Sequence, residues 1–167
     1  MTTVSAPQTE INSVIALYSN GQIQEALDAV TTLTNGYPND PLVYNISGIC
    51  YKTIGELDEA VKSFERALSI KPSYAEVHYN LGLTFQDLGQ LDSAVRSYKK
   101  AIAIKPDYAN ACNNLGVTLQ DLGQLDAAIK SFAQAITIKP EFAEAHYNLG
   151  GALQNLGQFV ARLLWSS

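Results

Sequence analysis

The sequence has few of the residues that most often build catalytic and metal centres. Among 167 residues there are two cysteines, two histidines and one tryptophan. Cys50 and Cys112 fall in different segments at unrelated positions, so we expect two reduced, buried thiols rather than a disulfide. His78 and His146 have no third metal ligand placed near them, and each is expected to fill space and make one hydrogen bond. We therefore expect no enzyme activity, no metal site and no cofactor within this chain.

Positive charge is also scarce. Eleven Lys and Arg residues stand against sixteen Asp and Glu residues, giving a formal net charge of −5, which disfavours nucleic acid as a partner. No apolar run reaches the length of about eighteen residues that a membrane-spanning helix needs, so no membrane partner is expected. The N-terminus MTTVSAPQTE has neither a basic region nor an apolar core, so no secretory signal is visible. A cytoplasmic location is the default that follows.

The dominant feature of the chain is a repeat of 34 residues. Segments 75–108 and 109–142 are identical at 19 of 34 aligned positions. Two residue types mark the same interval along most of the chain, namely prolines at Pro38, Pro72, Pro106 and Pro140, and glycines at Gly21, Gly55, Gly89, Gly123 and Gly157. A period of this length is typical of stacked helix-turn-helix units.

These repeats resemble the tetratricopeptide repeat family, whose pattern is an aromatic residue, Leu-Gly, a second aromatic, then Ala and Phe in a second helix, then Pro. The third repeat matches it with His78, Leu81, Gly82, Phe85, Ala94, Tyr98, Ala101 and Pro106. The resemblance implies an all-α fold, a right-handed superhelical solenoid of antiparallel helix pairs. We expect a flexible segment 1–6 and a single array over 7–167, with repeats 7–40, 41–74, 75–108 and 109–142 and a partial repeat 143–167.

Local signals fit this frame. Asp40 followed by proline predicts a helix N-cap, and each glycine of the series predicts the end of a first helix. Ala60, Ala94 and Ala128 are expected at the tightest contact between the paired helices. These features predict nine helices and a short or frayed tenth, which would begin after Gly157.

Polar residues recur on the expected concave side of the first helices. Each asparagine side chain has one acceptor and two donor hydrogens, which suits the backbone of an extended peptide. The predicted peptide-binding groove contains Asn12, Asn45, Tyr79, Asn80, Gln86, Asp87, Asn113, Asn114, Gln120, Asp121, Tyr147, Asn148 and Gln154. The row resembles the asparagine ladder in the repeats of O-linked N-acetylglucosamine transferase, with which it shares the wording HYNLG at 78–82 and 146–150. Alternatively, the asparagines only satisfy one another or solvent.

The resemblance implies a protein–protein interaction scaffold that binds an extended peptide or partner protein. The family's other mode, a basic clamp for acidic tails, is disfavoured because Lys52 is the only base on this side. Two alternatives remain, a substrate-recruiting segment of a larger glycosyltransferase or sulfotransferase and a self-assembling scaffold. In the partial repeat we expect an apolar patch that either folds back as one or two turns or forms a homodimer, through Phe159, Leu163, Leu164 and Trp165.

Overall fold

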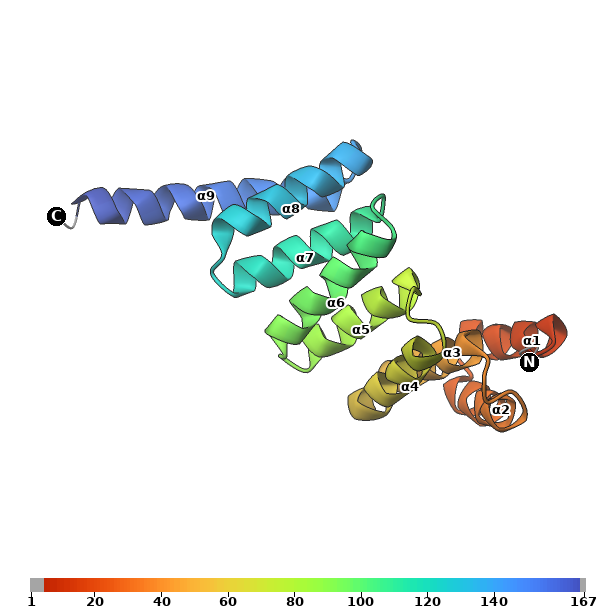
Figure 1. The fold of residues 1–167 in the computed structure, drawn as a ribbon. Helices are drawn as coiled ribbons and strands as arrows, with labels where there is room; N and C mark the ends of the chain where they lie inside the picture. Colours follow the sequence, from red (N-terminus) through yellow and green to blue (C-terminus); the bar gives the residue numbers. More distant parts are fainter. Residues whose placement is uncertain (1–4, 166–167) are drawn as a thin grey trace.

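The computed structural model describes residues 5–165, with side chains described to residue 160. Over this range the chain forms nine α-helices and no strand (Figure 1). Their bounds are α1 Gln8–Ser19, α2 Ile23–Gly36, α3 Pro41–Thr53, α4 Leu57–Ile70, α5 Ala75–Asp87, α6 Leu91–Ile104, α7 Ala109–Asp121, α8 Leu125–Ile138 and α9 Ala143–Trp165.

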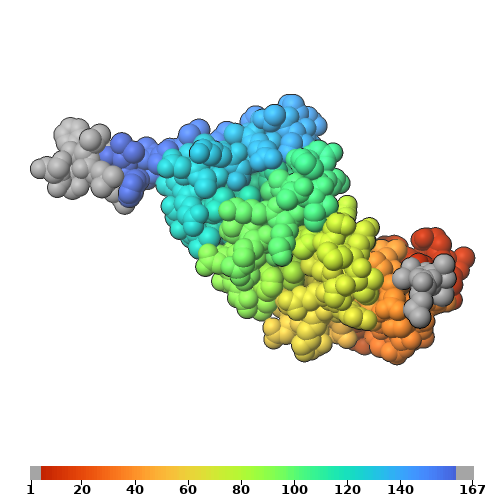
Figure 2. Space-filling view, in the orientation of Figure 1, coloured from red at the N-terminus to blue at the C-terminus, as the bar shows by residue number. Residues whose placement is uncertain are grey.

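The helices pack as successive antiparallel pairs, and the two ends of the chain lie at opposite ends of an elongated body (Figures 1 and 2). We call the first helix of each pair an A helix and the second a B helix. Successive A helices contact one another, as α3 does α5, α5 does α7 and α7 does α9. Within the described part, successive B helices make no contact of comparable extent. The array therefore curves with the A helices on its concave side, and the predicted all-α solenoid is confirmed.

The helix ends follow the expected signals. Asp40 caps α3, because its carboxylate accepts the Leu42 backbone N–H at 2.9 Å. It also accepts the backbone N–H of Ala6 at 2.9 Å, which ties the segment before α1 to the start of α3. The glycine that ends each of the first four A helices has a positive φ of 70° to 83°, a conformation that L side chains rarely adopt.

Each full repeat from the second to the fourth packs an aromatic ring directly on a glycine. A Cβ atom added to Gly82 would lie 2.6 Å from the ring of Tyr98, and the same geometry joins Gly48 to Phe64. The neighbouring Ala94 has no exposed surface, as predicted for the tightest contact between an A and a B helix. These small residues let the two backbones approach closely enough for the ring to be fully buried.

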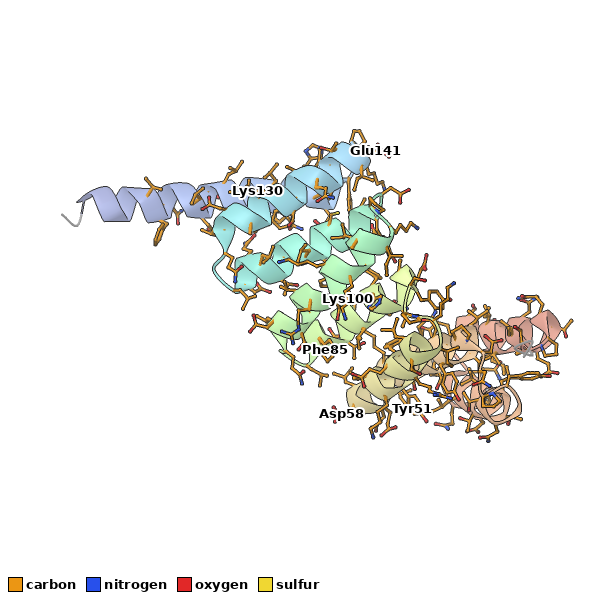
Figure 3. All side chains as sticks on the ribbon, viewed as in Figure 1. Tyr51, Asp58, Phe85, Lys100, Lys130 and Glu141 are labelled. Carbon is orange, nitrogen blue, oxygen red and sulfur yellow. The ribbon has the colours of Figure 1, made fainter. Side chains whose placement is uncertain are left out.

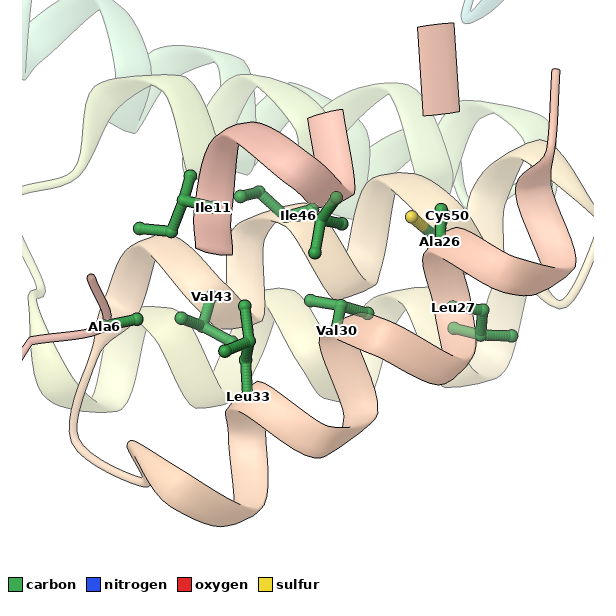
Figure 4. Packing of buried hydrophobic residues seen from close by; sticks show 10 residues of the cluster. Ala6, Ile11, Ala26, Leu27, Val30, Leu33, Val43, Ile46 and Cys50 are labelled. Carbon is green, nitrogen blue, oxygen red and sulfur yellow. The ribbon is translucent and has the colours of Figure 1, made fainter. Parts of the chain in front are cut away.

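In the first repeat, different residues fill the contact between the paired helices. Val14 stands where the later repeats have glycine, and Val30 stands where they have the aromatic ring. Both are buried, at 2% and 0% exposure, within the cluster shown in Figure 4. The smaller B-helix side chain leaves the space that the larger A-helix side chain fills.

The fifth repeat departs from the expectation. α9 runs through Gly157 without a turn and continues to Trp165, so the predicted break and separate tenth helix are wrong. In the second to fourth repeats a B helix folds back and its ring covers the A-helix glycine, whereas nothing lies within 4 Å of a Cβ added to Gly150. Without that packing, continuing the helix gains one backbone hydrogen bond per residue. The end of α9 consequently leaves the body of the array (Figure 1). No helix in the described part is long and apolar enough to cross a membrane.

Candidate functional site on the concave surface

One hydrogen bond recurs at three successive boundaries between A helices. In each case the donor is an asparagine Nδ2, and the acceptor lies 35 residues earlier in the chain. The three bonds run from Asn80 to Asn45 Oδ1 at 3.0 Å, from Asn114 to the Tyr79 hydroxyl at 3.1 Å and from Asn148 to Asn113 Oδ1 at 3.0 Å. We call the three donors the asparagine row.

The asparagine row keeps part of its hydrogen-bonding capacity. All three side chains are half-buried, and the contact across the boundary uses one of the two Nδ2 hydrogens of each. The Oδ1 of Asn114 also receives a long bond, 3.4 Å, from Asn113. The sequence left two uses of these asparagines open, and the structure shows that bonding to the neighbouring repeat occupies one N–H of each.

Two residues predicted to line the groove are instead buried. Asn45 is 8% exposed and Asn113 is 1% exposed, because the next A helix covers the flank on which each lies. Asn113 in addition donates to Glu144 Oε1 of α9 at 2.9 Å. Each accepts the hydrogen bond that holds a member of the asparagine row, Asn80 or Asn148, and its burial leaves little surface for a ligand.

The asparagine row does not extend to the first boundary. There the two corresponding positions are Ile11 and Ile46, which are 3% and 8% exposed and pack in the same apolar cluster. Asn12 is exposed on α1 and accepts a hydrogen bond from Gln8 within its own helix, at 2.9 Å. The polar surface thus covers α5, α7 and α9.

The other predicted polar rows are partly engaged within the array. Gln86 is half-buried and accepts the hydroxyl hydrogen of Tyr98 at 2.9 Å. Asp87 forms an ion pair with Lys52 at 2.7 Å, which occupies the single base of this side. In the next repeat Gln120 is half-buried and Asp121 is exposed. The concave surface therefore offers amides and carboxylates and no free cation among its described side chains.

Tyr79, whose hydroxyl accepts the hydrogen bond from Asn114, belongs to a cluster of three tyrosine rings. The ring of Tyr79 lies 4.9 Å from that of Tyr108 and 5.9 Å from that of Tyr98, measured between ring centres. Burial raises the pKa of Tyr98, and burial, with Tyr79 and Glu76 nearby, raises the pKa of Tyr108 to about 12. The phenols stay neutral, so the hydroxyl groups of Tyr98 and Tyr79 keep their hydrogen-bonding roles across the physiological range.

The C-terminal end of the site is a hollow of about 490 Å³. Its lining includes four predicted site residues, Gln120 from α7 and Tyr147, Asn148 and Gln154 from α9. Tyr147 occupies the position of Tyr79 but is 83% exposed, because in the described part of the chain no A helix packs on this side of α9. The hollow therefore combines an exposed aromatic ring with amide side chains.

Comparison with known proteins assigns the family. A family model for the TPR repeat matches residues 48–89, 85–123 and 119–157, which together span more than half of the chain. The chain belongs to the TPR repeat family. A comparison with curated proteins gave no match.

Solved TPR structures share the fold. A crystal structure of MamA superposes with a TM-score of 0.81 at 26% identity, covering 86% of this chain and 84% of that one. A MamA fragment from Desulfovibrio magneticus RS-1 gives 0.82 at 23% identity, covering 90% and 85%, a likeness in fold alone. YrrB, described as a TPR protein with an unusual peptide-binding site, gives 0.75 at 25% identity, covering 89% and 76%.

Each histidine of this TPR array pairs with a backbone carbonyl, and each cysteine is a free, buried thiol. His78 is buried and its Nε2 pairs with the Pro72 carbonyl at 2.9 Å, and His146 repeats the contact with Pro140 at 2.7 Å. Both cysteines are free and buried, and burial raises the pKa of Cys112 to about 11. Among the described residues, no group of His, Cys, Asp or Glu could hold a metal ion.

The residues predicted for self-association lie at the end of α9. Phe159 is 56% exposed and its neighbour Val160 is 46% exposed, so this part of the helix presents apolar surface. The fold-back of one or two turns is wrong, since α9 continues straight. The side chains of Leu163, Leu164 and Trp165 lie outside the described residues.

Proposed function

We propose that this TPR array is a protein-interaction scaffold that holds an extended segment of a partner against its concave surface. The observation that carries the proposal is the asparagine row, Asn80, Asn114 and Asn148. One hydrogen bond fixes each carboxamide to the preceding repeat, which leaves the second N–H of each to donate to a carbonyl of the ligand. A preorganised polar group loses little entropy on binding, so fixing the amides favours affinity.

The spacing suits an extended chain. Packed helices lie about 8–10 Å apart, and an extended strand advances about 3.3 Å per residue. One asparagine per repeat then corresponds to roughly three ligand residues per step, so the row addresses a segment of about seven to nine residues. Contacts to backbone groups are independent of the ligand's side chains, and the exposed ring of Tyr147 supplies an apolar anchor at one end.

The similarity to YrrB supports the same class of function, because that TPR protein is described as having a peptide-binding site. The charge of the surface restricts the ligand. Asp87 is paired with Lys52, whereas Asp121 and Glu144 have no ion pair among the described residues. We infer that the bound segment is neutral or basic.

The test separates ligand binding from the structural bond. Peptides selected from a random displayed library on the wild-type array serve as probes. Asn114→Ala removes the carboxamide, whereas Tyr79→Phe removes only its acceptor across the boundary. Because one hydrogen bond is worth about 0.5–1.5 kcal/mol, both variants should lose similar stability, but Asn114→Ala should weaken peptide binding roughly three- to tenfold.

Melting temperature and affinity are measured for both variants. Wild-type affinity in Asn114→Ala would show that the asparagine row serves only to join the repeats. Tyr79→Phe keeps the carboxamide but releases it from the preceding repeat, so its loss of affinity should be the smaller of the two.

A further inference from the structure

A second surface with ligand-binding features lies on the convex side, between the B helices α4 and α6. Two hollows of about 320 and 380 Å³ share Leu68, His78 and Lys100, and so form one continuous groove. We call this the α4–α6 groove. Its floor is α5 and its walls are the two B helices, and Phe85 and Lys100 from it are labelled in Figure 3.

The α4–α6 groove has an apolar lining contributed by all three helices. Leu81 of α5 is almost fully buried at its base, while Leu68 of α4 and Phe85 of α5 are half-buried and still present surface. At the far end, Ile104 of α6 is 39% exposed. The groove can therefore remove apolar side chains of a ligand from water, at about 25 cal/mol per Å² buried.

Two cations stand along one wall of the groove. Arg96 and Lys100 lie one turn apart on α6, and in the described part of the chain neither is within 4.0 Å of a carboxylate. Arg96 donates instead to the hydroxyl of Ser93 at 2.9 Å. Glu65 on the opposite wall is the one acid in the lining. The groove is thus locally cationic on a chain of net charge −5.

His78 does not add charge to this surface. It is buried at the base of the groove, and its Nε2 pairs with the Pro72 carbonyl. Burial lowers the pKa of the imidazole, with a further lowering from Lys100. The cationic character at neutral pH therefore comes from the two bases of α6.

We propose that the α4–α6 groove is a second docking site, for a short segment of a partner protein that carries both carboxylates and apolar side chains. The two free cations complement carboxylates of such a segment, and the apolar lining covers its apolar side chains. The two faces then select differently, since the concave surface carries amides and carboxylates and its single base, Lys52, is already paired. From Ser93 to Ile104 the wall of α6 is about 16 Å long, which accommodates roughly five residues of extended chain.

The following repeat offers an internal comparison. At the positions of Lys100 and Phe85 it has Gln134 and Leu119. Leu119 is 4% exposed, whereas Phe85 is half-buried. The combination of an accessible ring and two cations therefore does not recur at every pair of B helices. Between α2 and α4 the equivalent residues are Tyr51, Lys62 and Arg66, but there Lys62 is paired with Glu59 and Arg66 donates to the Pro38 carbonyl at 3.2 Å, so two unpaired cations distinguish the α4–α6 groove.

The experiment uses a synthetic pool of peptides about five residues long, patterned acid–apolar–apolar–acid–apolar to fit the groove. The acids are Asp or Glu and the apolar residues Leu, Ile or Phe. Two control pools replace every acid by Lys or every apolar residue by Ser. The readout is the amide chemical shifts of the isotope-labelled full chain, with Leu68, Phe85 and Ala103 reporting on the groove and Asn80 and Asn114 on the concave side.

The acidic–apolar pool should shift the groove amides, and both control pools should not. Arg96→Gln combined with Lys100→Gln should weaken the binding at least fivefold, whereas Lys99→Gln, a change of the same kind on the same helix, should leave it unchanged. All three residues are exposed, so the substitutions should not affect folding, and an unchanged melting temperature verifies this. The proposal is overturned if the acidic–apolar pool leaves the groove amides unshifted, moves the concave amides instead, or binds the double variant as well as wild type.

Discussion

Replacing a single glycine should have opposite effects in two repeats that share the same local sequence. Gly82 and Gly150 both follow the sequence His-Tyr-Asn-Leu, and both lie inside an A helix. A Cβ added to Gly82 would lie 2.6 Å, 2.7 Å and 3.0 Å from three ring atoms of Tyr98, whereas one added to Gly150 meets nothing within 4 Å. Only the packing of the B helix distinguishes the two sites.

The expected magnitudes follow from two opposing effects. Alanine in a helix interior is more favourable than glycine by about 0.5–1 kcal/mol, and this gain applies at both sites. At Gly82 the methyl group also forces the buried ring of Tyr98 to move, and overpacking of this kind costs about 1–3 kcal/mol. Gly150→Ala should therefore stabilise the protein slightly, and Gly82→Ala should destabilise it by up to about 2 kcal/mol.

Urea unfolding followed by circular dichroism measures the difference between the two variants. A third comparison tests the cause: Gly116→Ala should be less damaging when Phe132→Leu removes the ring above it than when the ring is present. If Gly82→Ala proves as stable as Gly150→Ala, the close approach of the paired helices is not what the glycine provides, and the account of the repeat core is wrong.

Two further pairs of variants test other parts of the structure. Because burial lowers the pKa of His78 from its ordinary 6.5, the unfolded chain binds a proton more readily, so stability should fall as the pH drops below about 6.5. His78→Gln should lessen that fall in melting temperature more than His146→Gln, and equal slopes would contradict it. Ala94→Leu, at a site with no exposed surface, should cost about 1–3 kcal/mol, whereas Ala143→Leu on the exposed start of α9 should cost almost nothing; equal melting temperatures would refute the assignment of the helix contacts.

The fold was predictable because each repeat carries its own signals for where its helices begin and end. Asp40 and Pro41 start α3, and Gly55 ends it in a conformation that other residues rarely adopt. The small residue at Ala60 marks the contact between paired helices, and it has no exposed surface in the structure. These signals are local in sequence and recur every 34 residues. Several repeats therefore predict the same pair of helices independently.

The candidate site was predictable in part. Recurrence at 34-residue spacing located the asparagine row, but it could not show whether Asn80 and Asn45 bond to each other or to a ligand, since both arrangements place them on the same flank. That Asn113 is buried depends on α9 covering it, a contact between helices separated by a whole B helix. The α4–α6 groove gave no sequence signal of its own, because Arg96 and Lys100 read as ordinary exposed residues of an amphipathic helix.

The sequence by itself determined the helical pairs, their order and the small residues at which they meet, because turn conformation, helix capping and apolar periodicity act over a few residues. The tertiary structure alone decided which of the polar residues are buried and hydrogen-bonded between repeats and which remain on a surface. It also decided that α9 continues through Gly157, although the same glycine position ends four earlier helices. A glycine permits a turn without requiring it, and the turn forms where a returning B helix can bury apolar side chains against the preceding A helix.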